Sequence, residues 1–128
     1  MEMYSPFNID KIDQYPYIRI PIDIYTSDKF KHLSDGAKLL YGIIYNSLVL
    51  SIENGWHDEE FNIYTIYKTT QIMVDLNCSR QKAVKLLKEL ETIGLIRRVK
   101  QSVGYPNLIY VDYDYINGHT NYPWSFKQ

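Results

Sequence analysis

The stretch that decides the fold is residues 77–98, NCSRQKAVKLLKELETIGLIRR. We expect a helix there from Arg80 to Ile93, because Ser79 is a favourable N-cap and Gly94 stands where glycine commonly ends a helix. Its apolar residues recur at helical spacing and predict one buried stripe: Ala83, Leu86, Leu87, Leu90 and Ile93. The basic and amide side chains near the start of this helix lie off the stripe, so they should face solvent.

A shorter helix is expected immediately before this one. Thr69 or Thr70 can cap a helix that runs to Leu76, with its apolar residues directed inward. Two residues, Asn77 and Cys78, separate it from the Ser79 cap. A connection this short makes the helices cross steeply and exposes the amino end of the second, which is the arrangement of a helix-turn-helix.

Further regular elements are expected on both sides of this pair. A long, mostly buried helix should begin at Ser34-Asp35 and end at Asn54-Gly55, and residues 63–67 (IYTIY) resemble a short strand. Residues 95–99 and 108–113 should pair as a hairpin around the turn at 104–107 (GYPN). We therefore predict a mainly helical α+β fold: a winged helix-turn-helix with a C-terminal β-hairpin wing and an extended N-terminal arm or strand.

The two ends of the chain lack such periodicity. Residues 1–17 are polar and tyrosine-rich and should form an arm, and residues 19–25 (RIPIDIY) alternate as an edge strand or extended segment would. We expect the winged-helix domain at 18–116. Residues 117–128 should be a linker, or a truncated end leading to a missing C-terminal domain.

The charge of the 128-residue chain is unevenly distributed. The net charge is -1, but residues 1–67 carry a balance of -5 and residues 68–100 a balance of +5. Phosphate binding needs a basic face and not a basic protein, so this asymmetry fits a nucleic-acid partner. The alternative is an ordinary solvated surface on which Lys85 and Lys88 pair with acidic neighbours.

Recognition helices contact bases through their first turns. Ser79 and the free amides beside it can bind a phosphate, Arg80 can bind guanine and Gln81 can bind adenine. In the wing, we assign Arg97, Arg98 and Lys100 to phosphates. The complete predicted DNA-binding set is Ser79, Arg80, Gln81, Lys82, Lys85, Arg97, Arg98, Lys100, Gln101, Tyr105 and Asn107.

Patterns for catalysis, cofactors and metals are weak. There is no phosphate-binding glycine loop, the three histidines are scattered, and the single cysteine, Cys78, suits packing under the turn. The acidic residues at 58–60 are best explained by solvation. We expect a non-enzyme without catalytic residues, cofactor or metal. With neither a disulfide nor an apolar span, we expect a cytoplasmic protein without a membrane partner.

Three separated blocks together resemble a known family: residues 33–56 (LSDGAKLLYGIIYNSLVLSIENGW), 77–98 and 104–111 (GYPNLIYV). From about Tyr17 to Tyr113 the chain resembles the N-terminal domain of RepA_N replication initiators, found on plasmids of Gram-positive bacteria, including staphylococcal multiresistance plasmids. The resemblance implies a winged helix that binds double-stranded origin repeats (iterons), usually inside the initiator's own coding sequence.

The same resemblance implies a homodimer, and pairing of dimers that could bridge origins for copy control. It also implies that host replication proteins are contacted through a C-terminal domain resembling the primosome protein DnaD. The arm, the 19–25 strand and the long helix could build the dimer. Two alternatives stay open: a winged-helix transcription regulator, and a protein-interaction winged helix that does not bind DNA.

Overall fold

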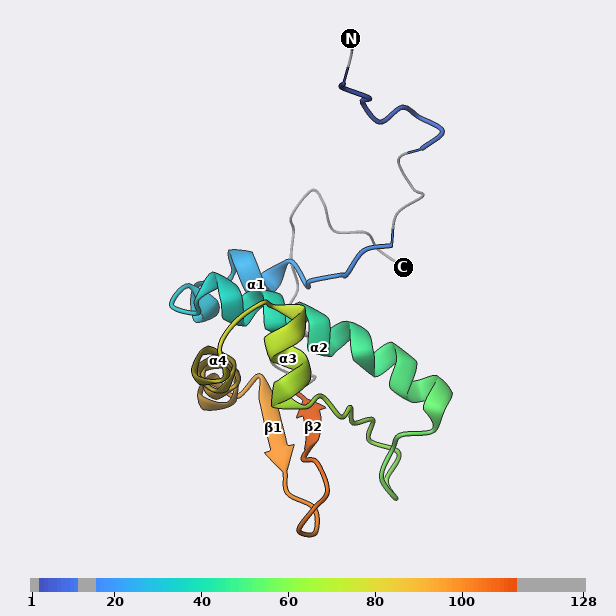
Figure 1. Ribbon diagram of the computed structural model, residues 1–128. Helices are drawn as coiled ribbons and strands as arrows, with labels where there is room; N and C mark the ends of the chain where they lie inside the picture. The colour runs from blue at the N-terminus through green and yellow to red at the C-terminus, as the bar shows by residue number, and fades with distance from the viewer. Residues whose placement is uncertain (1–2, 12–15, 113–128) are drawn as a thin grey trace.

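The computed structural model describes residues 3–11 and 16–112. Its elements are α1 (Asp23–Thr26), the 3₁₀ helix η1 (Asp28–Phe30), α2 (Asp35–Asn54), α3 (Thr69–Asp75), α4 (Arg80–Ile93), β1 (Ile96–Val99) and β2 (Leu108–Val111) (Figure 1). The domain is mainly helical with a small two-stranded antiparallel sheet, an arrangement like that of a winged helix. The predicted linker at 117–128 lies outside the described residues.

Helix α2 begins and ends where the sequence predicted. The Ser34 hydroxyl accepts a hydrogen bond from the Ala37 amide at 3.2 Å, and Gly55 ends the helix with a left-handed φ of 72°. The inner face buries Leu40, Tyr41 and Ile44 completely. Because glycine has no Cβ, it adopts this left-handed conformation without steric cost and stops the helix sharply.

The predicted helix-turn-helix is present as α3, a tight turn and α4. Lys68, with no side-chain cap bond, is the N-cap of α3, so the predicted cap at Thr69 or Thr70 is wrong by one or two residues. Asn77 makes the turn with φ 50°, and the Ser79 hydroxyl accepts from the Lys82 amide at 3.1 Å. Helix α4 has the predicted bounds and ends at Gly94, with φ 91°.

The hydrophobic core lies between α2 and α4. Ile96 and Ile109, one from each strand of the sheet, are buried in the same core. The stripe predicted on α4 is buried at Ala83, Leu86, Leu87 and Leu90, and half-buried at Ile93. The helices approach closely at Gly36, where a Cβ would lie 3.1 Å from the Leu86 Cδ2 atom and would require that side chain to shift slightly. Packing at this density fixes the orientation of α4 on α2.

The hairpin projects away from the helices (Figure 1). Its register pairs Ile96 with Val111 and Val99 with Leu108, so each strand is shorter than predicted, and Tyr113 lies outside the described residues. The strand predicted at 63–67 is wrong. The segment forms two isolated bridges, Ile63 with His57 and Thr65 with Ile109, and the second pair exchanges two backbone hydrogen bonds of 2.9 Å. The Thr65 hydroxyl also bonds to Ser47 on α2, so this segment divides its contacts between sheet and helix.

The strand predicted at 19–25 is also wrong. The chain is extended only to Pro21 and then turns into α1, where the Pro21 carbonyl accepts from the Ile24 amide at 3.0 Å. Asn46 on α2 exchanges two hydrogen bonds with the backbone of Arg19, 3.1 and 2.6 Å long. A Cβ on Gly42 would lie 2.4 Å from the Ile20 Cγ1 atom. Contact with α2 therefore replaces strand pairing here.

Candidate nucleic-acid interface

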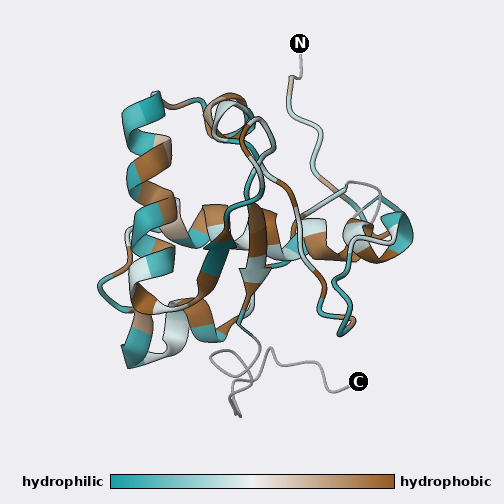
Figure 2. Ribbon diagram, turned by 90° about the horizontal axis from the view of Figure 1, so that it is seen from below, coloured by the Kyte–Doolittle hydropathy of each residue, from teal (hydrophilic) through white to brown (hydrophobic). Residues whose placement is uncertain are grey.

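The first turns of α4 present polar side chains to solvent. Ser79, Arg80, Gln81, Lys82 and Lys85 are all exposed. The α4 ribbon alternates between hydrophilic and hydrophobic residues around its axis (Figure 2), as expected when one stripe is packed and the opposite face is free. All five residues predicted on this helix are therefore accessible to a large ligand.

The acidic side chains of α4 are engaged by other elements. The Glu89 carboxylate accepts from the Ser34 amide at 3.0 Å and from the Ser34 hydroxyl at 2.8 Å, which ties α4 to the start of α2. Glu91 pairs with Arg98 on β1. Within the described ranges, neither Lys85 nor Lys88 has an ion pair with a carboxylate. Glu89 keeps its own charge, because Ser34 is neutral, but four cations of α4 (Arg80, Lys82, Lys85 and Lys88) are exposed, so its outer face is basic overall.

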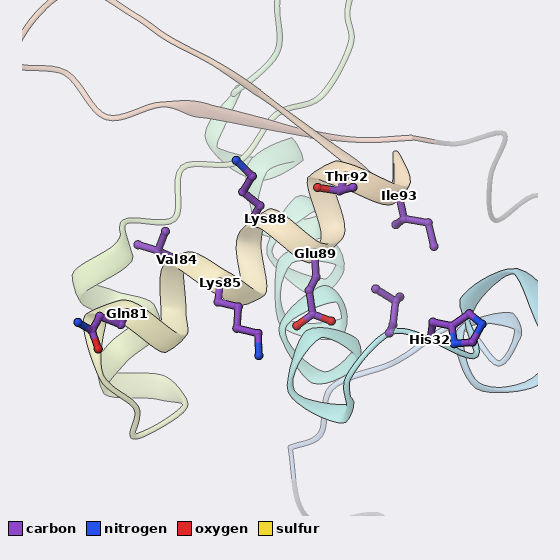
Figure 3. Close-up of a pocket in the computed structure, with 9 residues that line it drawn as sticks. His32, Gln81, Val84, Lys85, Lys88, Glu89, Thr92 and Ile93 are labelled. Carbon is purple, nitrogen blue, oxygen red and sulfur yellow. The ribbon is translucent and has the colours of Figure 1, made fainter.

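A shallow groove of about 700 Å³ runs along this outer face (Figure 3). It is bounded by α4 and by His32 and Leu33 from the loop before α2. Of the residues that line it, the predicted set contains only Gln81 and Lys85, and those that it missed include His32, Val84 and Lys88. Val84 and Lys88 could have been found from their helical spacing with Gln81. His32 could not, because its approach to α4 depends on tertiary packing.

The residues predicted on the hairpin turn differ in exposure. Lys100, Gln101 and Tyr105 are exposed, and Asn107 is half-buried. The side-chain amide of Gln101 donates a hydrogen bond to the Pro106 carbonyl at 2.7 Å and so links the two sides of the turn. Gly104 adopts φ 92°, a left-handed conformation that glycine accommodates without strain. The exposed tip therefore offers one cation and one tyrosine.

Arg97 and Arg98 lie on opposite faces of the hairpin, because side chains alternate along a strand. The Arg97 guanidinium is exposed and lies 5.7 Å from the centroid of the Tyr110 ring. Arg98 faces α4, where its Nε and Nη2 atoms donate to Glu91 at 3.2 and 2.8 Å. Hydrogen bonding to Arg98 lowers the pKa of Glu91, and the same contact raises the pKa of Arg98. Of the two arginines predicted to bind phosphates, Arg97 is therefore exposed to solvent, whereas Arg98 is bonded to Glu91.

Asp58 organises the acidic loop after α2. Its carboxylate accepts from the backbone amides of Glu60 and Asn62, each at 2.9 Å, and from the Tyr110 hydroxyl at 3.2 Å. These bonds, led by the one from the Asn62 backbone, lower the pKa of Asp58. In the described part of the chain, no group of three His, Cys, Asp or Glu side chains is placed to hold a metal ion. The observed role of Asp58 is to join this loop to β2.

Across residues 3–11 and 16–112, no helix combines the length and apolar character required to cross a membrane.

Cys78 is half-buried against the core beneath the turn, where the sequence placed it.

The fold and this surface define a winged-helix-like domain that presents the basic amino end of a helix. Residues 16–122 match the family model described as replication initiator protein A (RepA) N-terminus, and the chain belongs to that family. This confirms the resemblance found in the sequence. The family match extends over most of the chain.

Solved structures of similar fold support the assignment. The chain is 33% identical to an N-terminal domain of a DNA-binding protein, with a TM-score of 0.70 and coverage of 86% of this chain and 84% of that one. A Rep–DNA complex gives 33% identity and a TM-score of 0.70, covering 84% and 83%. An MDR initiator gives 36% identity and a TM-score of 0.66, covering 84% of each chain.

A curated relative is much longer. The 41 kDa protein of Lactobacillus helveticus is 22% identical over 111 residues, which are 82% of this chain and 31% of that protein. The chain therefore spans about a third of the length of this relative.

Proposed function

We propose that this domain initiates plasmid replication by binding double-stranded origin iterons, with the first turns of α4 in the major groove. The observation that carries the proposal is the exposed face of α4 on which cations outnumber carboxylates, with Glu89 bonded to α2 and Glu91 paired with β1. Similarity to a solved Rep–DNA complex over 84% of the chain supports it. The proposal assigns no catalytic residue, cofactor or metal to the domain.

In this proposal Ser79 and the first-turn amides bind a phosphate, and Arg80 and Gln81 contact base edges. Arg80 is suited to guanine and Gln81 to adenine, because each offers two hydrogen bonds in the geometry of that base. Lys82 and Lys85 lie where they can contact the flanking backbone. Each base contact contributes about 1–3 kcal/mol of discrimination between base pairs.

The hairpin acts as the wing in the same proposal. Its exposed residues Lys100, Gln101 and Tyr105 lie at the tip, where they can reach the backbone or the minor groove beside the recognition helix. Arg97 is exposed on the outer side of the wing and is assigned to a more distant phosphate. Asn107 is half-buried and contributes less.

We propose that the domain acts as a homodimer through the carboxyl half of α2. Val49, Leu50 and Ile52 are about 60% exposed there, and Tyr45 is 38% exposed. Apolar side chains gathered on one exposed surface are typical of protein contacts. Copy control by bridging two origins, and contacts with host replication proteins through a further domain, follow from the family resemblance.

The dimer is tested by analytical ultracentrifugation of the wild type and of Val49→Glu. A charge at the contact should shift the variant to monomer at concentrations where the wild type is a dimer. A wild type that stays monomeric to high concentration would contradict the dimer, without affecting the assignment of DNA binding.

The test of DNA binding is a footprint of the domain on the coding region of its own initiator. Evenly spaced protected repeats are expected, with an affinity that falls steeply as salt increases, since bound phosphates release counterions. Protection confined to a single promoter-like site would indicate a transcription regulator. A flat salt dependence would indicate that the domain binds a protein.

A further inference from the structure

Glu91 and Arg98 connect the recognition helix to the wing. Glu91 lies in the last turn of α4, Arg98 lies in β1, and seven residues separate them along the chain. Both carboxylate oxygens are used, one by Nε at 3.2 Å and one by Nη2 at 2.8 Å. Their side chains are 35% and 26% exposed, so the pair is partly shielded from water. Such two-point contact fixes direction as well as distance.

Because Arg98 lies in β1, its contact with Glu91 affects where the following residues of the wing are held. Two residues carry the chain from Arg98 to Lys100, which is at most about 7 Å of extended chain. A tilt of about 10° at Arg98 would therefore move the Lys100 backbone by about 1 Å. A binding group must be held to about 0.5 Å and 10–20°, so such a tilt is sufficient to misplace Lys100.

The other connections of the wing are backbone bonds, apolar contacts and the hydrogen bond from the Tyr110 hydroxyl to Asp58. The Leu95 amide donates to the Leu90 carbonyl, and the Asp112 amide donates to the Leu95 carbonyl. Ile96 and Ile109 are buried in the core. Ile109 lies opposite Arg98 in the register and is bridged to Thr65, so these contacts hold β2 at the level of the pair. The Glu91–Arg98 pair is the ion pair that joins β1 to α4 at that level.

We propose that Glu91 and Arg98 form a brace that sets the angle between the wing and α4, and that Arg98 is a positioning residue for DNA binding and not a phosphate ligand. This rests on the proposed function. It revises the expectation that Arg97 and Arg98 contact phosphates in the same way. The brace acts through Lys100 and the wing tip, which make the contact with DNA.

Glu91→Gln separates the two roles of Arg98 because they predict opposite results. The substitution keeps the side-chain shape, removes the negative charge and leaves Arg98 with at most one of its two bonds to this side chain. If Arg98 braces the wing, affinity for a duplex carrying the protected repeat should fall about fivefold, and protection beneath the wing should weaken while protection beneath α4 remains. If Arg98 is a phosphate ligand restrained by Glu91, affinity should rise, and that result would overturn the proposal.

A charge-exchanged variant supplies the second measurement. Arg98→Glu alone places two carboxylates together and should weaken binding about tenfold, whereas Arg98→Glu combined with Glu91→Arg restores an ion pair at unchanged net charge. The double variant should bind within about twofold of the wild type, with circular dichroism reporting that both variants fold. A folded double variant that binds as weakly as Arg98→Glu would overturn the brace.

The same measurements distinguish failure of the brace from failure of the proposed function. A wild-type domain that shows no salt-dependent binding of the duplex would remove the proposed function, and the brace with it. A wild type that binds normally while Glu91→Gln is unchanged would remove the brace alone.

Discussion

Helices α2 and α4 follow the same local rules but expose different chemistry. Each is capped by a serine hydroxyl and each ends at a glycine with left-handed φ. Their outer faces diverge: α2 exposes Val49, Leu50 and Ile52, whereas α4 exposes mainly cations and amides. The caps determine where a helix begins and ends, but the uncovered face determines its partner. An apolar face suits another protein, and a basic face suits a polyanion.

The largest effect should come from the inner face of α2. Ile44 is fully buried, so Ile44→Ala removes apolar contacts and leaves a cavity, at a cost of about 2–5 kcal/mol in the free energy of unfolding. Val49→Ala on the outer face should change this free energy by less than about 0.5 kcal/mol. Urea denaturation of both variants measures the difference. Equal losses would mean that the α2 outer face is packed in the isolated domain.

The next effect concerns the outer face of α4. Arg80→Ala should reduce affinity for the iteron duplex by about 1–3 kcal/mol and relax discrimination against a random duplex. Lys100→Ala should weaken both duplexes alike and reduce the salt slope by about one. Fluorescence anisotropy at several salt concentrations measures each change. The division between base and backbone contacts would be refuted by variants that lose affinity equally on both duplexes.

The two serine caps should differ in their contribution to stability. Ser34→Ala loses the bond from the Ala37 amide and the bond to Glu89, so it should cost about 2 kcal/mol. Ser79→Ala loses one cap bond and should cost about 1 kcal/mol. Thermal unfolding of the two variants measures both costs. A Ser79→Ala cost at or above that of Ser34→Ala would contradict the role of the Glu89 contact.

The smallest effect is the pH dependence of the brace. Hydrogen bonding to Arg98 lowers the pKa of Glu91 from its ordinary value of 4.5, with Lys88 adding a smaller effect. A depressed carboxyl pKa stabilises the fold above the unfolded value and loses that contribution as the pH falls through the folded value.

The contribution should be roughly 0.5 kcal/mol, because the pair is partly exposed and screened. The wild type should therefore exceed Glu91→Gln in stability at pH 7 by this amount, and the gap should close below about pH 4. Chemical denaturation over this range measures the gap. A gap that persists in acid would have to come from packing of the side chain and not from its charge.

Much of the candidate site could be predicted because its signals are local. The bounds of α4, its Ser79 cap and the exposure of Arg80, Gln81, Lys82 and Lys85 all follow from spacing within one helix. The state of Arg98 could not be predicted in this way. A basic residue near a turn can contact a phosphate or a carboxylate, and the sequence does not show which one lies within reach.

The sequence alone determined the helix-turn-helix, the hairpin and the charge of the outer face of α4, because caps, turns and periodicity act within about one turn or strand. Tertiary structure decided the rest. Asn46 binds the Arg19 backbone before the chain turns into α1, Thr65 forms a bridge to Ile109, and Glu89 binds Ser34 from 55 positions away. Contacts between distant residues select among conformations that are locally similar in free energy, so only the folded chain shows which was chosen.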